Sequence, residues 1–214
     1  MRLEPRLTIA LGIALAAAAS SAQTPAPGKV LLDQLRAGGL VLFMRHAHAD
    51  VGEDLLQDPT FWQECKKQRN LSNTGKLDAN RVGLALRGLG VPVSRVFTSG
   101  LCRALDTGKL LQVGQPEVSV GLSDYNTWKA MGNDPDKLPD VYRTTIAMQP
   151  AAGTNHVLVS HAHRGRFTAH PVLDLIEMGT VAVFRPFGTG AFELLGTIRP
   201  GDWQYLGVQE LPSK

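Results

Sequence analysis

Residues 40–50 read LVLFMRHAHAD, and this stretch decides how the rest of the chain is interpreted. Its first half is an uninterrupted apolar run from Leu40 to Met44, which is typical of a strand covered on both faces in a parallel sheet. Its second half changes abruptly to polar residues, namely Arg45, His46, His48 and Asp50. A polar cluster directly after a buried strand has three interpretations: a metal site, a phosphate site or the polar end of a strand.

Strands and helices alternate along most of the chain. The segment LSNTGKLDANRVGLALRGLG (71–90) has apolar residues at helical spacing, with Ser72 as a candidate cap and two glycines as stop signals. A second short strand is predicted over 94–99, and residues 100–111 form a helix with one apolar face. The pattern then predicts a brief strand, a loop, a weak helix and a buried strand over 118–120, 124–139, 141–148 and 156–161.

The C-terminal part has a different pattern. Residues 180–198, TVAVFRPFGTGAFELLGTI, contain two β-rich runs separated by PFGTG, which predicts a hairpin. We therefore expect an α/β fold: an open, mostly parallel twisted sheet with helices on both faces and a C-terminal antiparallel hairpin at the edge. Ligands of such sheets bind beyond the carboxyl ends of the strands.

The first 22 residues resemble a secretory leader. Two arginines precede an uncharged run over residues 7–19, which is too short to cross a bilayer, and small residues then provide a cleavage site after Ala22. We therefore expect a signal peptide over 1–22, one catalytic domain over 23–214, and a periplasmic or secreted location without stable membrane insertion after cleavage. A retained membrane anchor is the alternative.

Composition and cysteine content add two expectations. The 214-residue chain has a formal net charge of +3 and no basic run interleaved with aromatic residues, so we expect no nucleic-acid partner. Its two cysteines, Cys65 and Cys102, would meet an oxidising compartment after export, which favours a disulfide between them. Two unrelated buried thiols are the alternative.

Polar side chains gather at the ends of three predicted strands. They are Arg45 and His46 after the first strand, Thr98 and Ser99 at the end of the second with Arg103 in the helix that follows, and His161 at the end of a third. Because the carboxyl ends of parallel strands meet at one edge of a sheet, we expect these side chains to share one crevice. The helix that begins near Gly100 would add the positive end of its dipole. Guanidinium groups, imidazoles and a helix N-terminus together favour an anion, most naturally a phosphoryl group.

This set of groups predicts a chemistry. A neutral imidazole is a competent nucleophile toward phosphorus, and neighbouring cations keep it neutral by lowering its pKa. The same cations stabilise the charge on the oxygens of a phosphoryl group during its transfer. One histidine would attack in line, form a phosphohistidine and release the phosphate to water, so the expected partner is a small phosphorylated substrate.

Four motifs resemble the histidine phosphatase (phosphoglycerate-mutase-like) superfamily. In chain order they are LFMRHA, LSNTGKLDANRVG, VFTSGLCRALDT and VLVSHAHRG, and together they span most of the chain after the leader. The resemblance implies that His46 is the nucleophile and that Arg45, Arg103 and His161 complete the phosphate pocket, without a metal or a cofactor. The run CKKQRNLSNTG and the C-terminal pattern look closest to small exported bacterial members, the branch that includes lipopolysaccharide core heptose phosphatases.

Two further residues come from the same resemblance. Arg69 stands where short phosphohistidine phosphatases carry an additional pocket arginine, and Asp124, in GLSDYNTW, corresponds to the acid that protonates the leaving group in larger members. Asp124 can equally be a turn residue. The chain departs from the family at Ala47, where glycine is usual, and at His163 and Arg164 after the second histidine; these last two either contact an anionic substrate or lie at the surface.

Two other functions stay open on the sequence. HAHAD matches the His-x-His-x-Asp pattern of zinc hydrolases, although Arg45 would place a fixed positive charge beside the metal. A phosphate-ester binding protein without turnover is the other alternative, because changes near His161 can remove the chemistry and keep the anion pocket. The sequence carries no signal for the oligomeric state or for the compound that bears the phosphoryl group.

Overall fold

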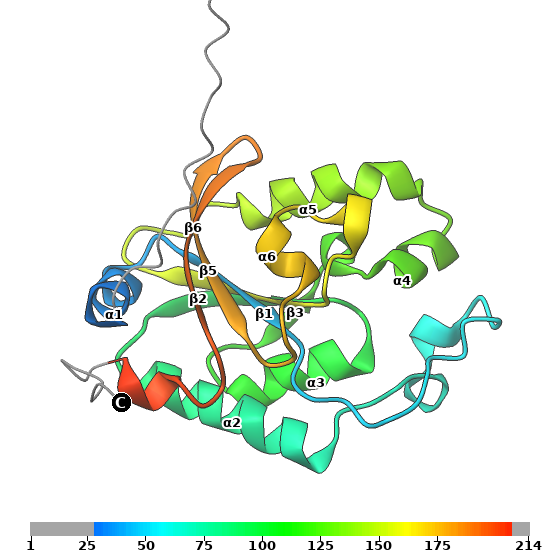
Figure 1. Cartoon of the computed structure of the whole chain (residues 1–214), viewed down its shortest axis with the longest axis horizontal. Coiled ribbons are helices and arrows are strands. Elements are labelled where there is room, and N and C mark those ends of the chain that lie inside the picture. Colours follow the sequence, from blue (N-terminus) through cyan, green and yellow to red (C-terminus); the bar gives the residue numbers. More distant parts are fainter. Residues whose placement is uncertain (1–27, 207–214) are drawn as a thin grey trace, which may run out of the picture.

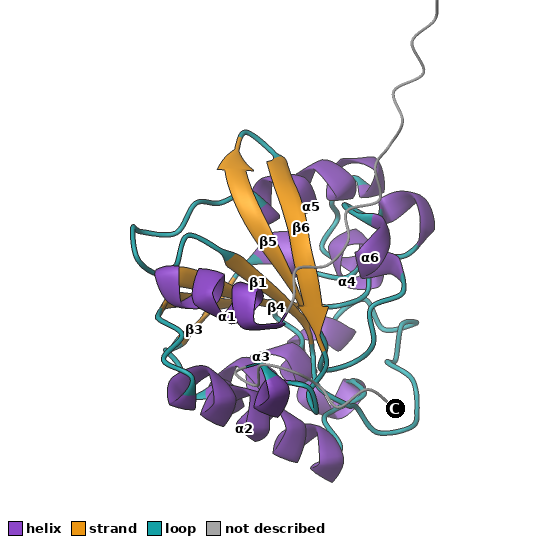
Figure 2. Ribbon diagram, turned by 60° about the vertical axis from the view of Figure 1, so that its left-hand side comes forward, coloured by secondary structure: helices purple, strands orange, loops and turns teal. Residues whose placement is uncertain are grey.

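The computed structural model describes residues 28–206, which form a six-stranded sheet with helices on both faces (Figures 1 and 2). The strand order is β3-β2-β4-β1-β5-β6. The strands are β1 (Val41–Arg45), β2 (Val93–Thr98), β3 (Pro116–Val118), β4 (Asn155–Ser160), β5 (Val181–Gly188) and β6 (Ala191–Ile198). The α-helices are α1 (Gly28–Ala37), α2 (Asn73–Gly88), α3 (Cys102–Leu111), α4 (Tyr125–Ala130), α5 (Leu138–Ile146) and α6 (Pro171–Asp174). The leader and its cleavage site lie outside the described residues.

The predicted fold class is confirmed. Strands β1 to β4 are parallel, whereas β5 pairs antiparallel with both β1 and β6, so the C-terminal hairpin forms one edge of the sheet. The two central strands are apolar almost throughout because both of their faces are covered: four of five β1 residues and all β4 residues are buried. Within residues 28–206, none of the helices is long and apolar enough to span a membrane.

Alternate residues of the central strands supply the two halves of the core. Leu42 and Met44 of β1 point to one face, where they join apolar residues of α1, α2 and α3. Val41 and Phe43 point to the other face and pack with Ile146 of α5 and apolar residues near α6. This two-residue alternation is the pleat of a strand, and it explains why the sheet separates two helical layers.

Two glycines allow the helices to approach the sheet and one another closely. A Cβ added at Gly75 would lie 1.9 Å from the carbonyl oxygen of His48, in the segment that follows β1. A Cβ at Gly83 would lie 2.0 Å from the carbonyl oxygen of Leu111, where α2 packs on α3. The start of α2 is fixed by the predicted cap, since the Ser72 side chain accepts from the Gly75 amide at 3.0 Å. The close contact at Gly75 and the cap at Ser72 therefore fix the start of α2 against the segment that follows β1.

The predicted disulfide is present. Cys65 and Cys102 are bonded, with their Cα atoms 5.6 Å apart, and the bond joins residues that lie 37 positions apart in the chain. It ties the long segment between β1 and α2 to the first residue of α3. In the loop-entropy model a bond closing such a span stabilises the fold by about 3 to 4 kcal/mol.

Some elements differ from the sequence prediction. The segment 124–139 was expected to be a loop, but it contains helix α4 and the start of α5, because Asp124 caps α4 and Pro139 occupies the first turn of α5, where proline is tolerated. The third strand ends at Val118, where the prediction began it. Helix α1, which no motif indicated, covers the sheet with three buried leucines: Leu31, Leu32 and Leu35.

Candidate active site

The register of the parallel strands brings the predicted site residues to one level. Arg45 at the end of β1 lies beside Ser160 of β4, and Thr98 of β2 lies beside Val159. The residues that directly follow β1 and β2 are also hydrogen-bonded to β4. The His46 amide donates to the Ser160 carbonyl at 2.9 Å, and the Ser99 amide donates to the Val159 carbonyl at 3.0 Å. His46, Ser99 and His161 therefore follow three adjacent strands at the same edge of the sheet.

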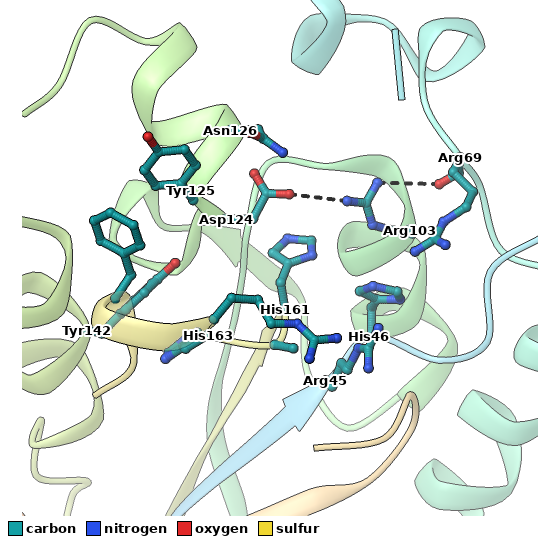
Figure 3. Close-up of a pocket in the computed structure, with 13 residues that line it drawn as sticks. Arg45, His46, Arg69, Arg103, Asp124, Tyr125, Asn126, Tyr142, His161 and His163 are labelled. Atoms are coloured by element: carbon teal, nitrogen blue, oxygen red, sulfur yellow. Dashed lines mark hydrogen bonds and ion pairs between the residues drawn. The ribbon is translucent and has the colours of Figure 1, made fainter. Parts of the chain in front are cut away.

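A cavity of about 190 Å³ opens beyond this edge (Figure 3). Its lining includes all six residues that the sequence assigned to the site: Arg45, His46, Arg69, Arg103, Asp124 and His161. His163 and Arg164, whose roles the sequence left open, also line it. The sequence analysis missed the aromatic and amide residues of the wall, namely Tyr125, Asn126, Tyr142 and Phe167. Tyr125 and Asn126 directly follow Asp124 in the run GLSDYNTW, but no pattern assigned them to the site, and Tyr142 and Phe167 come from α5 and from the segment after β4.

The His46 ring is held in one tautomer. Its Nδ1 lies 2.8 Å from the carbonyl oxygen of Ala47, which only accepts hydrogen bonds, so Nδ1 carries the proton and Nε2 keeps its lone pair. The ring is 2 % exposed. Burial lowers its pKa well below the ordinary value of 6.5, and the neighbouring His161 and Arg103 lower it further. His46 is therefore a neutral imidazole with a free nucleophilic nitrogen.

His161 is the second imidazole of the cavity, with its ring centroid 5.2 Å from that of His46. Its Nε2 lies 2.7 Å from the Ser99 hydroxyl oxygen, and this oxygen also accepts from the Leu101 amide at 3.4 Å. Burial, followed by Arg103, lowers the pKa of His161 well below its ordinary value. When the Ser99 hydroxyl donates to Nε2, the proton of the neutral ring lies on Nδ1, which is buried without a protein partner.

Arg45 and Arg103 each have one buried N–H group without a hydrogen-bond partner among the described residues. Arg45 donates from Nη1 to the Ile176 carbonyl at 2.8 Å, and Arg103 donates from Nη1 to Asp54 at 2.9 Å and from Nη2 to Asp124 at 3.3 Å. The Nε groups of both arginines are buried and have no partner. Burial, followed by the nearby Arg164, lowers the pKa of Arg45 to about 10, so its guanidinium group keeps its charge at neutral pH.

Three donors on side chains that line one cavity thus have no partner among residues 28–206: Nε of Arg45, Nε of Arg103 and Nδ1 of His161. A buried donor without a partner costs about 1 to 3 kcal/mol, and more for charged groups. A tetrahedral oxyanion carries several acceptor oxygens and can accept from more than one such donor. The cavity therefore combines cationic and imidazole groups with a neutral histidine ring, a combination that suits an anion.

Asp124 lies in the cavity wall and also caps a helix. Its Oδ1 accepts from the Thr127 amide at 2.8 Å and so caps α4, while its Oδ2 pairs with Arg103 at 3.3 Å. Figure 3 shows this carboxylate turned toward Arg103 at the wall of the cavity opposite His46. Asp124 is therefore both the first residue of a helical segment and a carboxyl group that faces the cavity.

Two amides at the start of helix α3 already have acceptors within the protein. The Leu101 amide donates to the Ser99 hydroxyl, and the Cys102 amide donates to the side-chain oxygen of Gln68 at 2.8 Å. Gln68 reaches this position from the segment before α2, which is a contact between distant parts of the sequence.

His163 and Arg164 lie in different environments. His163 is 1 % exposed and stacks on Tyr142, with ring centroids 3.5 Å apart and an angle of 7° between the planes, so of the two alternatives the surface position is excluded for it. Arg164 is exposed, lines the cavity and donates to the Asp174 carbonyl at 3.0 Å. It is the neighbouring charge with the largest effect on the pKa of Arg45.

The HAHAD motif does not assemble a zinc-binding set. Among residues 28–206, no group of three or more His, Cys, Asp or Glu side chains converges on one point. His46 points its free nitrogen into the anion pocket, whereas His48 is half-exposed and faces Asp78 at 3.6 Å. The ligands that the zinc hypothesis requires are therefore apart.

The buried histidines make the stability of the protein sensitive to acid. The folded-state pKa values of His46 and His161 lie well below 6.5, and that of His163 is lowered by burial to about 3. Between pH 6.5 and these values, the unfolded chain binds protons that the folded chain excludes, so stability falls as the pH falls. Each group contributes about 1.4 kcal/mol per pH unit in its window.

We expect the free energy of unfolding, measured by urea titration, to fall by roughly 3 to 6 kcal/mol between pH 7 and pH 5. The variant His163→Phe keeps an aromatic ring against Tyr142 but cannot be protonated, so its pH dependence should be about one third weaker. An unfolding free energy that is equal at both pH values would contradict the neutral, buried state of these rings.

Fold and site together define a class of protein: an open α/β protein with a cavity lined by arginine and histidine side chains at the carboxyl edge of its sheet. The chain is similar to the solved structure of the protein histidine phosphatase SixA complexed with tungstate, at 17 % identity over 76 % of this chain and 98 % of the other, with a TM-score of 0.49. It is also similar to a mutant phosphoserine phosphatase from Entamoeba histolytica in complex with phosphoserine, at 14 % identity over 74 % and 95 % of the two chains, with a TM-score of 0.45. No family model and no curated protein matches the sequence.

Proposed function

We propose that the protein is a phosphomonoesterase that acts through a phosphohistidine intermediate on His46 and requires no metal. The observation that carries this proposal is the set of three unsatisfied donors, on Arg45, Arg103 and His161, around a cavity that also contains the free Nε2 of His46. Such an arrangement binds the oxygens of a phosphoryl group and places a nucleophile beside its phosphorus.

The reaction proceeds in two balanced steps. In the first, Nε2 of His46 forms a bond to phosphorus while the bond from phosphorus to the ester oxygen breaks, and the leaving oxygen takes a proton from the protonated form of Asp124, whose carboxylate form pairs with Arg103. In the second, water attacks the phosphohistidine, Asp124 accepts a proton from this water, and the bond between Nε2 and phosphorus breaks to release inorganic phosphate. The guanidinium groups of Arg45 and Arg103 stabilise the charge on the transferred oxygens in both steps.

The proposed substrate is a small phosphorylated compound. A cavity of about 190 Å³ accommodates a phosphoryl group and the first atoms of a leaving group, and Tyr125 and Phe167 at the wall, with ring centroids 4.6 Å apart, offer an aromatic surface to the remainder. We further propose that the protein is exported, as the leader pattern indicates, and that it belongs with the small exported members of the superfamily. N-terminal sequencing of the mature protein tests export, and a chain that retains Met1 would exclude cleavage after Ala22.

The activity is tested by release of phosphate from an aryl phosphate. We expect turnover that is unchanged by an excess of a divalent-metal chelator, and that persists below pH 6.5, because the pKa of His46 is lowered and the ring stays neutral there. Activity that the chelator abolishes and zinc restores would favour a zinc hydrolase. Tight binding of inorganic phosphate without any turnover would instead identify a phosphate-ester binding protein.

A further inference from the structure

Residues 50–70, the strap, form a long segment that lies beside the cavity and is drawn in cyan to teal in Figure 1. Its two arms are paired, since the Asp50 amide donates to the Asn70 carbonyl and the Leu55 amide donates to the Lys67 carbonyl, both at 2.9 Å. The strap is fastened to the start of α3 by the disulfide bond at Cys102 and by Gln68, which accepts from the Cys102 amide. Its position relative to α3 is therefore fixed at several points.

Asp54, in the first arm of the strap, joins two arginines of the cavity. Its Oδ1 accepts from the backbone amide of Arg69 at 2.8 Å and from Nη1 of Arg103 at 2.9 Å. Both side chains of the ion pair are largely buried, at 13 % exposure for Asp54 and 4 % for Arg103. Arg103 also donates weakly to the Arg69 carbonyl, at 3.5 Å, so the three residues form one connected group (Figure 3 shows the two arginines).

We infer that Asp54 is a positioning residue of the proposed phosphatase, and this inference rests on the proposed function. By holding Nη1 of Arg103, the carboxylate orients a guanidinium group whose Nε has no partner among the described residues. By holding the Arg69 amide, the same oxygen fixes the backbone from which the Arg69 side chain reaches the cavity wall. Asp54 would thus set the geometry of two phosphate-binding groups without touching the substrate.

The direction in which phosphate affinity changes when Asp54 is replaced distinguishes a positioning role from a purely electrostatic one. A negative charge near an anion site repels the anion, so removal of the Asp54 charge alone would tighten phosphate binding. Loss of orientation has the opposite effect, because a charge-assisted hydrogen bond that is broken frees the guanidinium group to adopt other positions. A positioning residue therefore predicts weaker binding despite a more positive cavity.

Two variants and one control test the inference. Asp54→Asn keeps the size and removes the charge, whereas Asp54→Glu keeps the charge and displaces it by one methylene. The matched control is Asp58→Asn, since Asp58 is a carboxylate on the same strap that pairs with Lys67 at 2.8 Å and does not line the cavity. Affinity for inorganic phosphate is measured by calorimetry, and kcat and KM are measured with an aryl phosphate on the full chain with its disulfide intact.

We expect both Asp54 variants to weaken phosphate binding and raise KM by about tenfold or more, with a smaller change in kcat, and the Asp58 control to stay within about twofold of the wild type. Phosphate binding that is unchanged or tighter in both Asp54 variants would overturn the inference. If Asp54→Asn does not fold, Asp54→Glu still tests the inference, because it keeps the negative charge in the strap. A wild-type protein that neither binds phosphate nor hydrolyses the ester would instead refute the proposed function.

Discussion

Replacement of His46 by alanine is expected to lower kcat for an aryl phosphate by at least about 10⁴-fold, because it removes the side chain that forms the bond to phosphorus in the first step of the proposed reaction. The cavity keeps its arginines and His161, so phosphate affinity should change far less than kcat. This separation between binding and turnover is the signature of a lost nucleophile.

His48 provides the matched control for this variant. It lies two residues after His46 in the same motif, but its ring is half-exposed and faces Asp78 outside the cavity. We expect His48→Ala to retain the wild-type rate within about twofold, a size typical of surface positions. Equal rates in the wild type and in His46→Ala would remove His46 from the mechanism.

Replacement of Arg45 by alanine is expected to lower kcat/KM by about 10²- to 10³-fold, the range for the loss of one donor to a developing oxyanion. Arg45 is anchored through Nη1 to the Ile176 carbonyl, which leaves its Nε free for a phosphoryl oxygen. Lysine at this position keeps the charge but cannot reproduce both contacts, so Arg45→Lys should still lose at least about tenfold.

Arg95 offers the control for this loss of positive charge. It is exposed in β2, where it forms a bidentate pair with Glu117 away from the cavity. Arg95→Ala should leave kcat/KM within about twofold of the wild type, as exposed ion pairs contribute little. A similar loss in both variants would mean that net charge, rather than placement at the cavity, determines the effect.

The central part of the fold could be predicted because its signals are local. The continuous apolar runs before Arg45 and before His161 identify strands that are covered on both faces, and Ser72 marks the start of a helix. Once these strands are parallel, their register alone brings His46 and His161 to the same edge of the sheet. For this reason four residues of the pocket could be predicted from their positions at strand ends or in the first turn of a helix: Arg45, His46, Arg103 and His161.

The features that could not be predicted from the sequence depend on contacts between residues that are far apart in the chain. Asp54 has no local signal, because its two partners lie 15 and 49 positions away, and the same holds for Gln68, which caps the first amide of α3 from 34 positions away. His163 could not be assigned to the interior from its neighbours, since its burial depends on stacking against Tyr142 of α5. Such groups become visible only when the helices are placed on the sheet.

The most direct test of the account is to trap the phosphoenzyme. The protein is mixed briefly with an aryl phosphate labelled at phosphorus, denatured in base and digested, and the labelled peptide is identified. The account predicts label on the peptide that contains His46, stable to base and labile to acid, and absent from His46→Ala. A protein that turns over the substrate without forming this label, or that carries an acid-stable label on another residue, would contradict the central claim.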